Sequence, residues 1–111
     1  MIIYQIHITR TAEQDLINVS DYISFILKNP QAANDLLNEA ESKINELSIF
    51  PQKFSLAEDV VLSAWGIRFA IVKNYLAFYL IDEQTTTVHI IRFLYRKSNW
   101  VSILKQGISI M

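Results

Sequence analysis

Positive charge and aromatic rings alternate over residues 89–100, which read His-Ile-Ile-Arg-Phe-Leu-Tyr-Arg-Lys-Ser-Asn-Trp. Three cations of this stretch, Arg92, Arg96 and Lys97, are of the type that binds a phosphate or a carboxylate. Charge-assisted hydrogen bonds contribute about 1.5–3 kcal/mol each where water is partly excluded. We expect Arg68 to reach the same cluster from a strand of the same sheet. The sequence therefore predicts one anion-binding cleft that Arg68 and Arg92 share.

Each of these side chains also has a structural interpretation. Arg92 can lie at a strand end, with its aliphatic stem on the core and its guanidinium in water. Tyr95 and Trp100 can stack nucleic-acid bases, although packing of the last helix on the sheet is the interpretation we favour. His7 and His89 are expected to be half-buried strand residues. Because they fall on different strands without an acidic neighbour at ligand spacing, no metal site is predicted.

The residues indicate no established type of catalytic centre. The chain has no cysteine, and no nucleotide-binding motif, Ser-His-Asp set or carboxylate pair is present. Cleavage of RNA would need Tyr95 or a lysine as the general base. A tyrosine pKa of about 10 would have to fall by about 3 units for that role. No cofactor is expected.

Charge is divided unevenly between the two halves of the chain. Residues 11–59 hold three cations and nine anions, a net charge of −6, whereas residues 60–111 hold six cations and two anions, a net charge of +4. The second half is therefore the half expected to face an anionic partner.

Length and composition indicate one ordered domain over residues 1–111, with 51% apolar residues and two each of glycine and proline. No apolar run approaches the ~20 residues of a membrane span. The first ten residues lack the charged region and cleavage site of a signal peptide. We therefore expect a cytoplasmic protein that does not contact a membrane.

The first half predicts a strand followed by a helical hairpin. Residues 2–8 are β-branched and aromatic, and Thr11 begins a Thr-x-x-Gln capping box. Apolar residues then recur at helical spacing over 12–28. Asn29-Pro30 ends this helix and starts a second one, which runs to about residue 48 and stops before Pro51. Two helices so closely joined must pack as an antiparallel pair.

The second half predicts three antiparallel strands and a final helix. Residues 67–72 and 75–81 form a hairpin with a two-residue turn, Lys73-Asn74, and residues 86–94 form the third strand. A helix over 99–106, capped by Ser98 and ended by Gly107, completes the order β-α-α-β-β-β-α. The class is α+β, an antiparallel sheet with the helical hairpin on one face. The apolar residues 108–111 suit either packing on the sheet edge or a subunit contact.

Strand alternation predicts which side chains meet the helices. Leu76, Phe78 and Leu80 share one face of the middle strand and are expected to meet the helical hairpin, which leaves Tyr75 and Tyr79 on the other face. The same rule places one row of the last strand on one face, namely Val88, Ile90, Arg92 and Leu94.

Three blocks of sequence resemble the RelE/ParE superfamily of bacterial toxins. They are YQIHITRTAEQDL at 4–16, GIRFAIVKNYLAFYLID at 66–82 and VHIIRFLYRKSNW at 88–100. The resemblance covers nearly the whole chain. It implies the toxin of a type II toxin–antitoxin module, of the kind associated with growth inhibition and plasmid stabilization, neutralised as a hetero-oligomer by a cognate antitoxin.

The two branches of this superfamily imply different targets. ParE-like toxins act on DNA gyrase by binding, whereas RelE-like toxins cut mRNA on the ribosome. Leu76 follows Tyr75 where RelE-like nucleases commonly carry an arginine, and the chain is acidic, with a pI of about 6.1. Gly66-Ile67-Arg68 and the basic pair before Trp100 are similar to ParE-like sequences. The resemblance is thus closer to the ParE-like branch, with an mRNA endonuclease as the alternative and a non-toxic interaction module as a third.

The resemblance and the charge pattern together give a set of candidate site residues. For binding of the target or the antitoxin they are Arg68, Lys73, Tyr75, Arg92, Tyr95, Arg96, Lys97 and Trp100. Under the nuclease alternative, the catalytic residues would be Arg68, Arg92, Tyr95 and Arg96.

Overall fold

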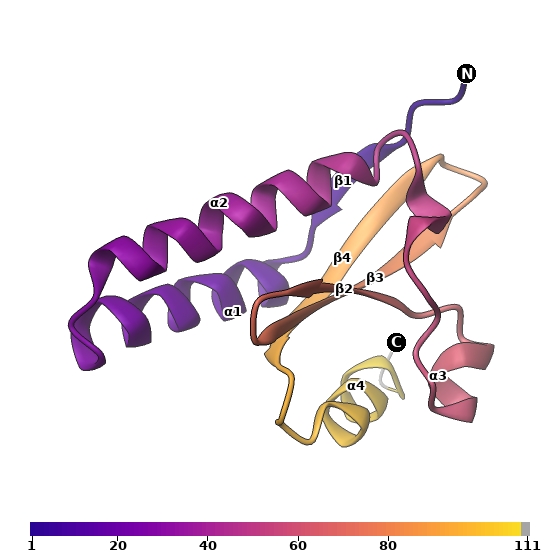
Figure 1. The fold of residues 1–111 in the computed structure, drawn as a ribbon. Helices are drawn as coiled ribbons and strands as arrows, with labels where there is room; N and C mark the ends of the chain where they lie inside the picture. Colours follow the sequence, from indigo (N-terminus) through magenta and orange to yellow (C-terminus); the bar gives the residue numbers. More distant parts are fainter. Residues whose placement is uncertain (110–111) are drawn as a thin grey trace.

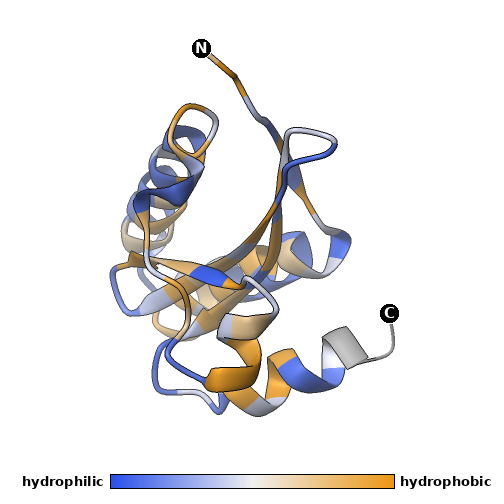
Figure 2. Ribbon diagram, turned by 90° about the vertical axis from the view of Figure 1, so that its right-hand side faces the viewer, coloured by the Kyte–Doolittle hydropathy of each residue, from blue (hydrophilic) through white to orange (hydrophobic). Residues whose placement is uncertain are grey.

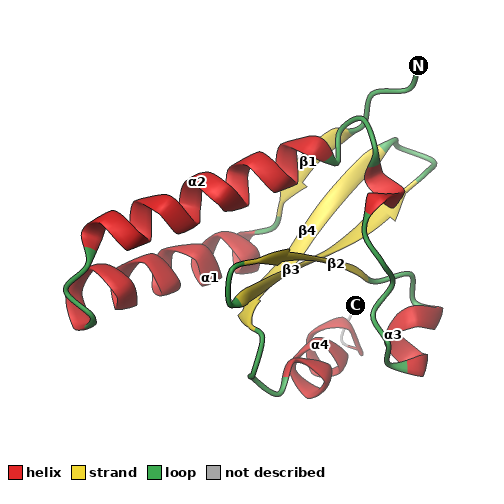
Figure 3. Ribbon diagram, in the orientation of Figure 1, coloured by secondary structure: helices red, strands yellow, loops and turns green. Residues whose placement is uncertain are grey.

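The chain folds into a four-stranded sheet with helices packed on both faces (Figures 1 and 3). The computed structural model describes residues 1–109, so Ile110 and Met111 of the apolar tail lie outside the described residues. In chain order the elements are β1 (Gln5–Ile8), α1 (Arg10–Asp21), the π-helix η1 (Tyr22–Ile26), α2 (Pro30–Glu46), the 3-10 helix η2 (Pro51–Lys53), α3 (Val60–Ala64), β2 (Arg68–Val72), β3 (Tyr75–Asp82), β4 (Thr87–Tyr95) and α4 (Trp100–Ser109). The predicted α+β class is confirmed, and η2 and α3 are additional elements.

The strands lie in the order β1-β4-β3-β2. The expected antiparallel pairing holds for β2, β3 and β4, but β1 pairs with β4 in parallel. The first and last strands of the chain are therefore neighbours in the sheet, and His7 of β1 lies opposite His89 of β4.

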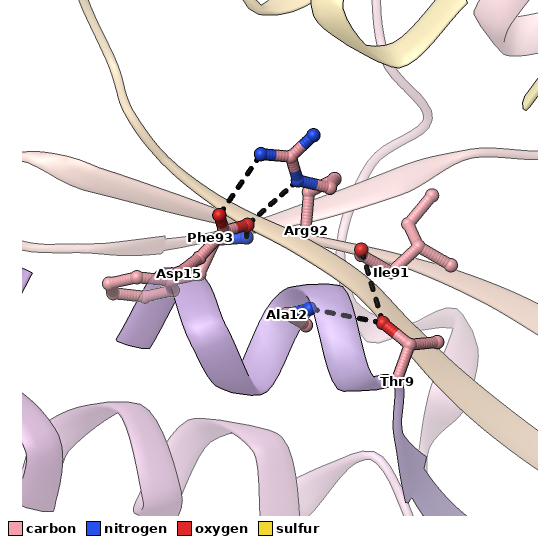
Figure 4. Close-up of polar contacts among 6 residues, drawn as sticks. All are labelled: Thr9, Ala12, Asp15, Ile91, Arg92 and Phe93. Carbon is pink, nitrogen blue, oxygen red and sulfur yellow. Dashed lines mark hydrogen bonds and ion pairs between the residues drawn. The ribbon is translucent and has the colours of Figure 1, made fainter. Parts of the chain in front are cut away.

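The helical hairpin begins two residues earlier than predicted. Thr9, not Thr11, caps α1, because its hydroxyl accepts a hydrogen bond from the Ala12 N–H at 3.2 Å. The same hydroxyl donates to the Ile91 carbonyl at 3.3 Å, so contact with β4 favours this cap (Figure 4). The Asn29-Pro30 start of α2 is confirmed, with the Asn29 side chain accepting from the Ala32 N–H.

The helical hairpin covers the sheet face opposite to the one predicted. Ala77 and Phe93 pack with Leu36 of α2 in one core cluster. Leu76 and Phe78 instead lie on the other face, in a cluster that α3 and α4 cover. The prediction was wrong because both faces of β3 are apolar, so alternation alone could not show which layer each row meets.

A β-bulge changes the alternation of the last strand. Phe78 pairs with Arg92, whereas the next residue, Tyr79, pairs with Ile90, so Ile91 is an extra residue in β4. Val88 and Ile90 consequently pack in a cluster with α2 residues, and Leu94 packs with α3 and α4. The predicted common face of these residues is therefore wrong.

The predicted two-residue turn is confirmed, with Lys73 at a positive φ of 55°. One further local prediction needs correction. Helix α4 continues through Gly107, and the Ser98 hydroxyl donates to the Tyr95 carbonyl at 2.6 Å instead of capping the helix. Figure 2 shows the strongly hydrophobic residues of α4, the helix that leads to the C-terminus. Within residues 1–109, no helix is long and apolar enough to cross a membrane.

Candidate functional site

Arg92 is paired with a carboxylate that the sequence pattern did not indicate. Its Nε and one terminal nitrogen donate to the two carboxylate oxygens of Asp15, at 2.7 and 3.0 Å (Figure 4). The side chains are only 26% and 13% exposed. Asp15 also accepts the Phe93 N–H at 3.0 Å. Asp15 of α1 thus accepts a backbone N–H group of β4 that β1 is too short to reach. It also largely neutralises the charge of Arg92 within the protein.

Arg68 has a different partner in a different part of the chain. One terminal nitrogen of its guanidinium donates to the Phe54 carbonyl at 2.7 Å, which ties β2 to the segment that follows η2. Beside it the Tyr79 hydroxyl donates to the Pro51 carbonyl at 2.8 Å. Arg68 and Arg92 therefore do not share a partner, and neither lines the two grooves described below. The expected common cleft is not built by these two residues.

A groove of about 780 Å³ lies between the helical hairpin and the adjoining ends of β3 and β4. We call it the hairpin groove; its lining includes Val19, Tyr22, Leu27, Lys73, Tyr75, Phe93 and Tyr95. The Tyr75 ring stacks on Phe93 at a centroid distance of 5.3 Å and meets the Tyr95 ring edge-on at 5.6 Å. Burial, and then the nearby Tyr95 and Tyr22, raise the pKa of the Tyr75 hydroxyl. The groove is thus an aromatic, largely apolar surface whose lining also includes Asp15 and Lys73.

The segment that follows α1 exposes large apolar side chains beside the hairpin groove; we call them its rim, and two of them, Tyr22 and Leu27, line the groove itself. Tyr22, Phe25, Ile26 and Leu27 are 50%, 72%, 67% and 56% exposed. They lie on or directly after η1, where the Leu27 N–H bonds the Tyr22 carbonyl in the π-helical pattern. Consecutive large apolar residues in water are typical of a surface that binds another protein.

The opposite face of the sheet carries a smaller groove of about 260 Å³, lined by Glu58, Phe69, Ile71, Leu76, Arg96 and Trp100. Trp100 packs against Phe78 at a ring distance of 5.2 Å, and so holds α4 on the sheet. The packing role favoured for Trp100 is therefore present. Apart from Arg96 and Glu58, the lining is apolar.

Arg96 and Lys97 are the exposed cations of the basic stretch. Both lie in the connection between β4 and α4, where the Arg96 N–H bonds the Asn74 carbonyl at 2.8 Å. Within the described part of the chain neither forms an ion pair, whereas Lys73 lies 3.8 Å from Glu39. The side chains of Arg96 and Lys97 are thus open to an external anion.

The geometry gives little support to acid–base chemistry. Arg92 is held by Asp15, and the raised pKa of the Tyr75 hydroxyl is opposite to what a general base requires. Within residues 1–109, no cluster of three or more His, Asp or Glu side chains could hold a metal ion. His7 and His89, expected on separate strands, do meet, with 2.9 Å between their Nδ1 atoms.

Solved structures identify the class of fold. A chain of the chromosomal ParDE toxin–antitoxin system from P. aeruginosa is similar, with a TM-score of 0.69 and 16% identity over 86% of this chain and 98% of that chain. A chain of the RelBE2 toxin–antitoxin complex from Mycobacterium tuberculosis has a TM-score of 0.57 and 24% identity over 85% and 99%. No curated protein is similar enough to count as a match. The chain shares its fold with these two chains.

The comparison with sequence families gives a more specific assignment than the fold does. Residues 6–100 match the family described as the ParE toxin of the type II toxin–antitoxin system parDE. The chain therefore belongs to the ParE toxin family, and the resemblance that the three sequence blocks indicated is confirmed.

Proposed function

We propose that this chain is a growth-inhibiting toxin that acts in the bacterial cytoplasm by binding DNA gyrase. The observation that carries the proposal is the state of the four cations of the predicted cluster: Arg92 is neutralised by Asp15, Arg68 is held by a backbone carbonyl, and Arg96 and Lys97 are exposed without an ion pair among the described residues. This arrangement supports binding of an anionic surface and gives a nuclease no activated base.

The hairpin groove is the proposed binding site for the cognate antitoxin. Its area is apolar and aromatic, and its rim exposes four large side chains that a soluble partner would cover. Lys73, Tyr75 and Tyr95 of the predicted set lie in this groove. A partner segment that inserts an apolar anchor beside Tyr75 would form a hetero-oligomer and cover the toxin surface.

The target surface is proposed to be the corner formed by Arg96, Lys97 and Trp100. Arg96 and Trp100 line the groove on the face opposite the hairpin groove, so antitoxin and target would contact different sides of the sheet end. Arg68 and Arg92 would support this corner indirectly, by fixing β2 and β4 through their internal hydrogen bonds.

The experiment is a gyrase supercoiling assay with purified protein, run beside an assay of mRNA on translating ribosomes. We expect inhibition of supercoiling that an Arg96→Ala, Lys97→Ala double variant reduces at least about tenfold, since each charge-assisted contact is worth roughly 1.5–3 kcal/mol. Lys53→Ala is the matched control, because Lys53 is an exposed cation that pairs with Glu46 elsewhere on the surface.

Two other outcomes would support the alternative functions, an mRNA endonuclease or a non-toxic interaction module. Ribosome-dependent transcript cuts that disappear in an Arg92→Ala, Arg96→Ala variant would establish the mRNA endonuclease instead. Normal growth after induction in a bacterial host, with the folded protein present, would favour a non-toxic interaction module.

A further inference from the structure

The histidines of the chain form one pair across the junction of its first and last strands. The parallel register places His7 of β1 directly opposite His89 of β4. Their Nδ1 atoms are 2.9 Å apart, and their rings are perpendicular with centroids 5.1 Å apart. Two imidazole nitrogens at this separation can share one proton, or they can both bind one metal ion.

The pair lies where water and ions have access. His7 is exposed and His89 is partly exposed. Tyr4, just before β1, and Ile6 of β1 pack in a core cluster with residues of α2 and so face away from the pair. An ion could therefore enter without opening the core.

The present 2.9 Å separation is that of an N–H···N hydrogen bond, and the 5.1 Å between the ring centroids shows that the two nitrogens point at one another, so both exposed rings must turn before their lone pairs converge on one ion. With metal–nitrogen bonds of about 2.0–2.1 Å, a separation of 2.9 Å corresponds to a nitrogen–metal–nitrogen angle of about 90°. That is the angle between neighbouring ligands in tetragonal or octahedral complexes, the geometry of Cu²⁺ and Ni²⁺. A tetrahedral Zn²⁺ site would need the nitrogens about 3.3 Å apart.

The local charge also favours a cation. The carboxylate of Asp82, at the end of β3, interacts electrostatically with His89. Asp82 is fixed in position because it accepts the backbone N–H groups of Gln84 and Thr85 at 3.0 and 3.3 Å. It therefore adds negative potential on the side of His89.

We propose that His7 and His89 form a two-histidine binding site for Ni²⁺ or Cu²⁺, with water in the remaining coordination positions. Both imidazoles bind through Nδ1 and carry their proton on Nε2. One of the two rings now donates its Nδ1–H to the other, so on metal binding this ring loses the Nδ1 proton and takes up one on Nε2. The bound ion joins β1 to β4 directly. Because the two nitrogens come together only in the folded sheet, binding stabilises the folded state. This inference does not depend on the proposed toxin function.

The test uses NiCl₂ and the full chain, with His7→Gln and His89→Gln as single variants. Both positions lie outside the core, so both variants are expected to fold, which circular dichroism checks. Titration calorimetry at neutral pH should show one Ni²⁺ per wild-type chain, with at least about tenfold weaker binding in either variant because the chelate is lost. At free Ni²⁺ of about ten times its Kd, the wild-type Tm should rise by about 5 °C.

Several results would overturn the proposal. One is an unchanged wild-type Tm at millimolar Ni²⁺. Another is that each single variant binds Ni²⁺ as tightly as the wild type, which would mean that the histidines act independently. A third is paramagnetic broadening by Ni²⁺ that leaves the imidazole NMR signals of both histidines unaffected. Retention of full binding in acid, where imidazoles are protonated, would exclude them as ligands.

Discussion

Asp15 is the residue on which the basic stretch depends most. The sequence showed it only as a polar position on an amphipathic helix, because its partners, Arg92 and the Phe93 N–H, lie 77 and 78 residues away. Long-range pairing of this kind leaves no periodic signal. The candidate site could therefore be predicted as a collection of cations, but not as one in which the central arginine is already neutralised.

Removal of the Asp15 carboxylate should destabilise the protein. Asp15→Ala leaves the partly buried Arg92 guanidinium and the Phe93 N–H without their acceptor, and we expect a loss of about 2–4 kcal/mol in the free energy of unfolding. Urea unfolding measures it. Glu13→Ala changes an exposed acid on the same helix and should stay within about 0.5 kcal/mol. A similarly small effect at Asp15 would show that the pair contributes nothing.

Thr86 holds a backbone conformation that its side chain disfavours. Its φ is 47°, in the left-handed region that β-branched residues rarely adopt. Thr86→Asn should therefore raise the free energy of unfolding by about 0.5–1 kcal/mol, because asparagine tolerates this region. Thermal melts would detect the gain. Gln84→Asn, at an exposed position of the same turn, is the control and should be neutral; destabilisation at Thr86 would contradict the expected relief of strain.

The Asp59 carboxyl group should make the free energy of unfolding depend on pH in the acid range. The Leu62 N–H, with Lys105 and the Val61 N–H, lowers the pKa of this carboxyl below its ordinary value. Because the folded pKa lies below the unfolded one, its contribution is present above about pH 4 and is lost as pH falls through the folded pKa. Asp59→Asn should lower stability at pH 7 and have a smaller effect at pH 3. An equal loss at both values would contradict this.

At the scale of elements, periodicity predicted the helices and strands but not their irregular parts. The stripe over 12–28 indicated one helix, whereas the structure divides it into α1 and the π-helix η1. Ile91 forms a bulge in β4, and its residue type gives no signal of a bulge. These irregularities depend on tertiary packing, which a local pattern cannot contain, and η1 is where the exposed apolar rim is formed.

Substitution on η1 should separate partner binding from stability. Phe25 is 72% exposed, so Phe25→Glu should change the free energy of unfolding by less than about 0.5 kcal/mol. If the hairpin groove binds the antitoxin, the same change should weaken that complex at least about tenfold in calorimetry. Ile49→Glu, at a 61% exposed position outside the groove, is the control. Equal binding by both variants would place the antitoxin elsewhere.

For the molecule as a whole, the sheet is the middle layer between two helical layers. The sequence indicated the class and the order of elements, because these follow from patterning along the chain. It did not indicate which layer met which row of β3, since Phe78 and Ala77 are both buried. It also left the parallel pairing of β1 with β4 unspecified, because the edge that a first strand joins is decided by packing and not by composition.

Both helical layers should contribute to one cooperative unit. Leu36 of α2 and Leu104 of α4 are 2% and 1% exposed, on opposite faces of the sheet. Leu36→Ala and Leu104→Ala should each cost about 2–5 kcal/mol in urea unfolding, with a single transition in both variants. A nearly neutral Leu104→Ala would mean that α4 is only loosely attached.

The neighbouring positions of β1 and β4 have a consequence for synthesis on the ribosome. The two helices of the hairpin are neighbours in the sequence and can pair early, but β1 and the α1 contacts with β4 lack their partner until β4 has left the exit tunnel. Until then a nascent chain has the hairpin without a closed sheet and without the corner that follows β4. The surface proposed to bind the target is therefore absent while most of the chain is being synthesised, and it is completed only after β4 has joined β1.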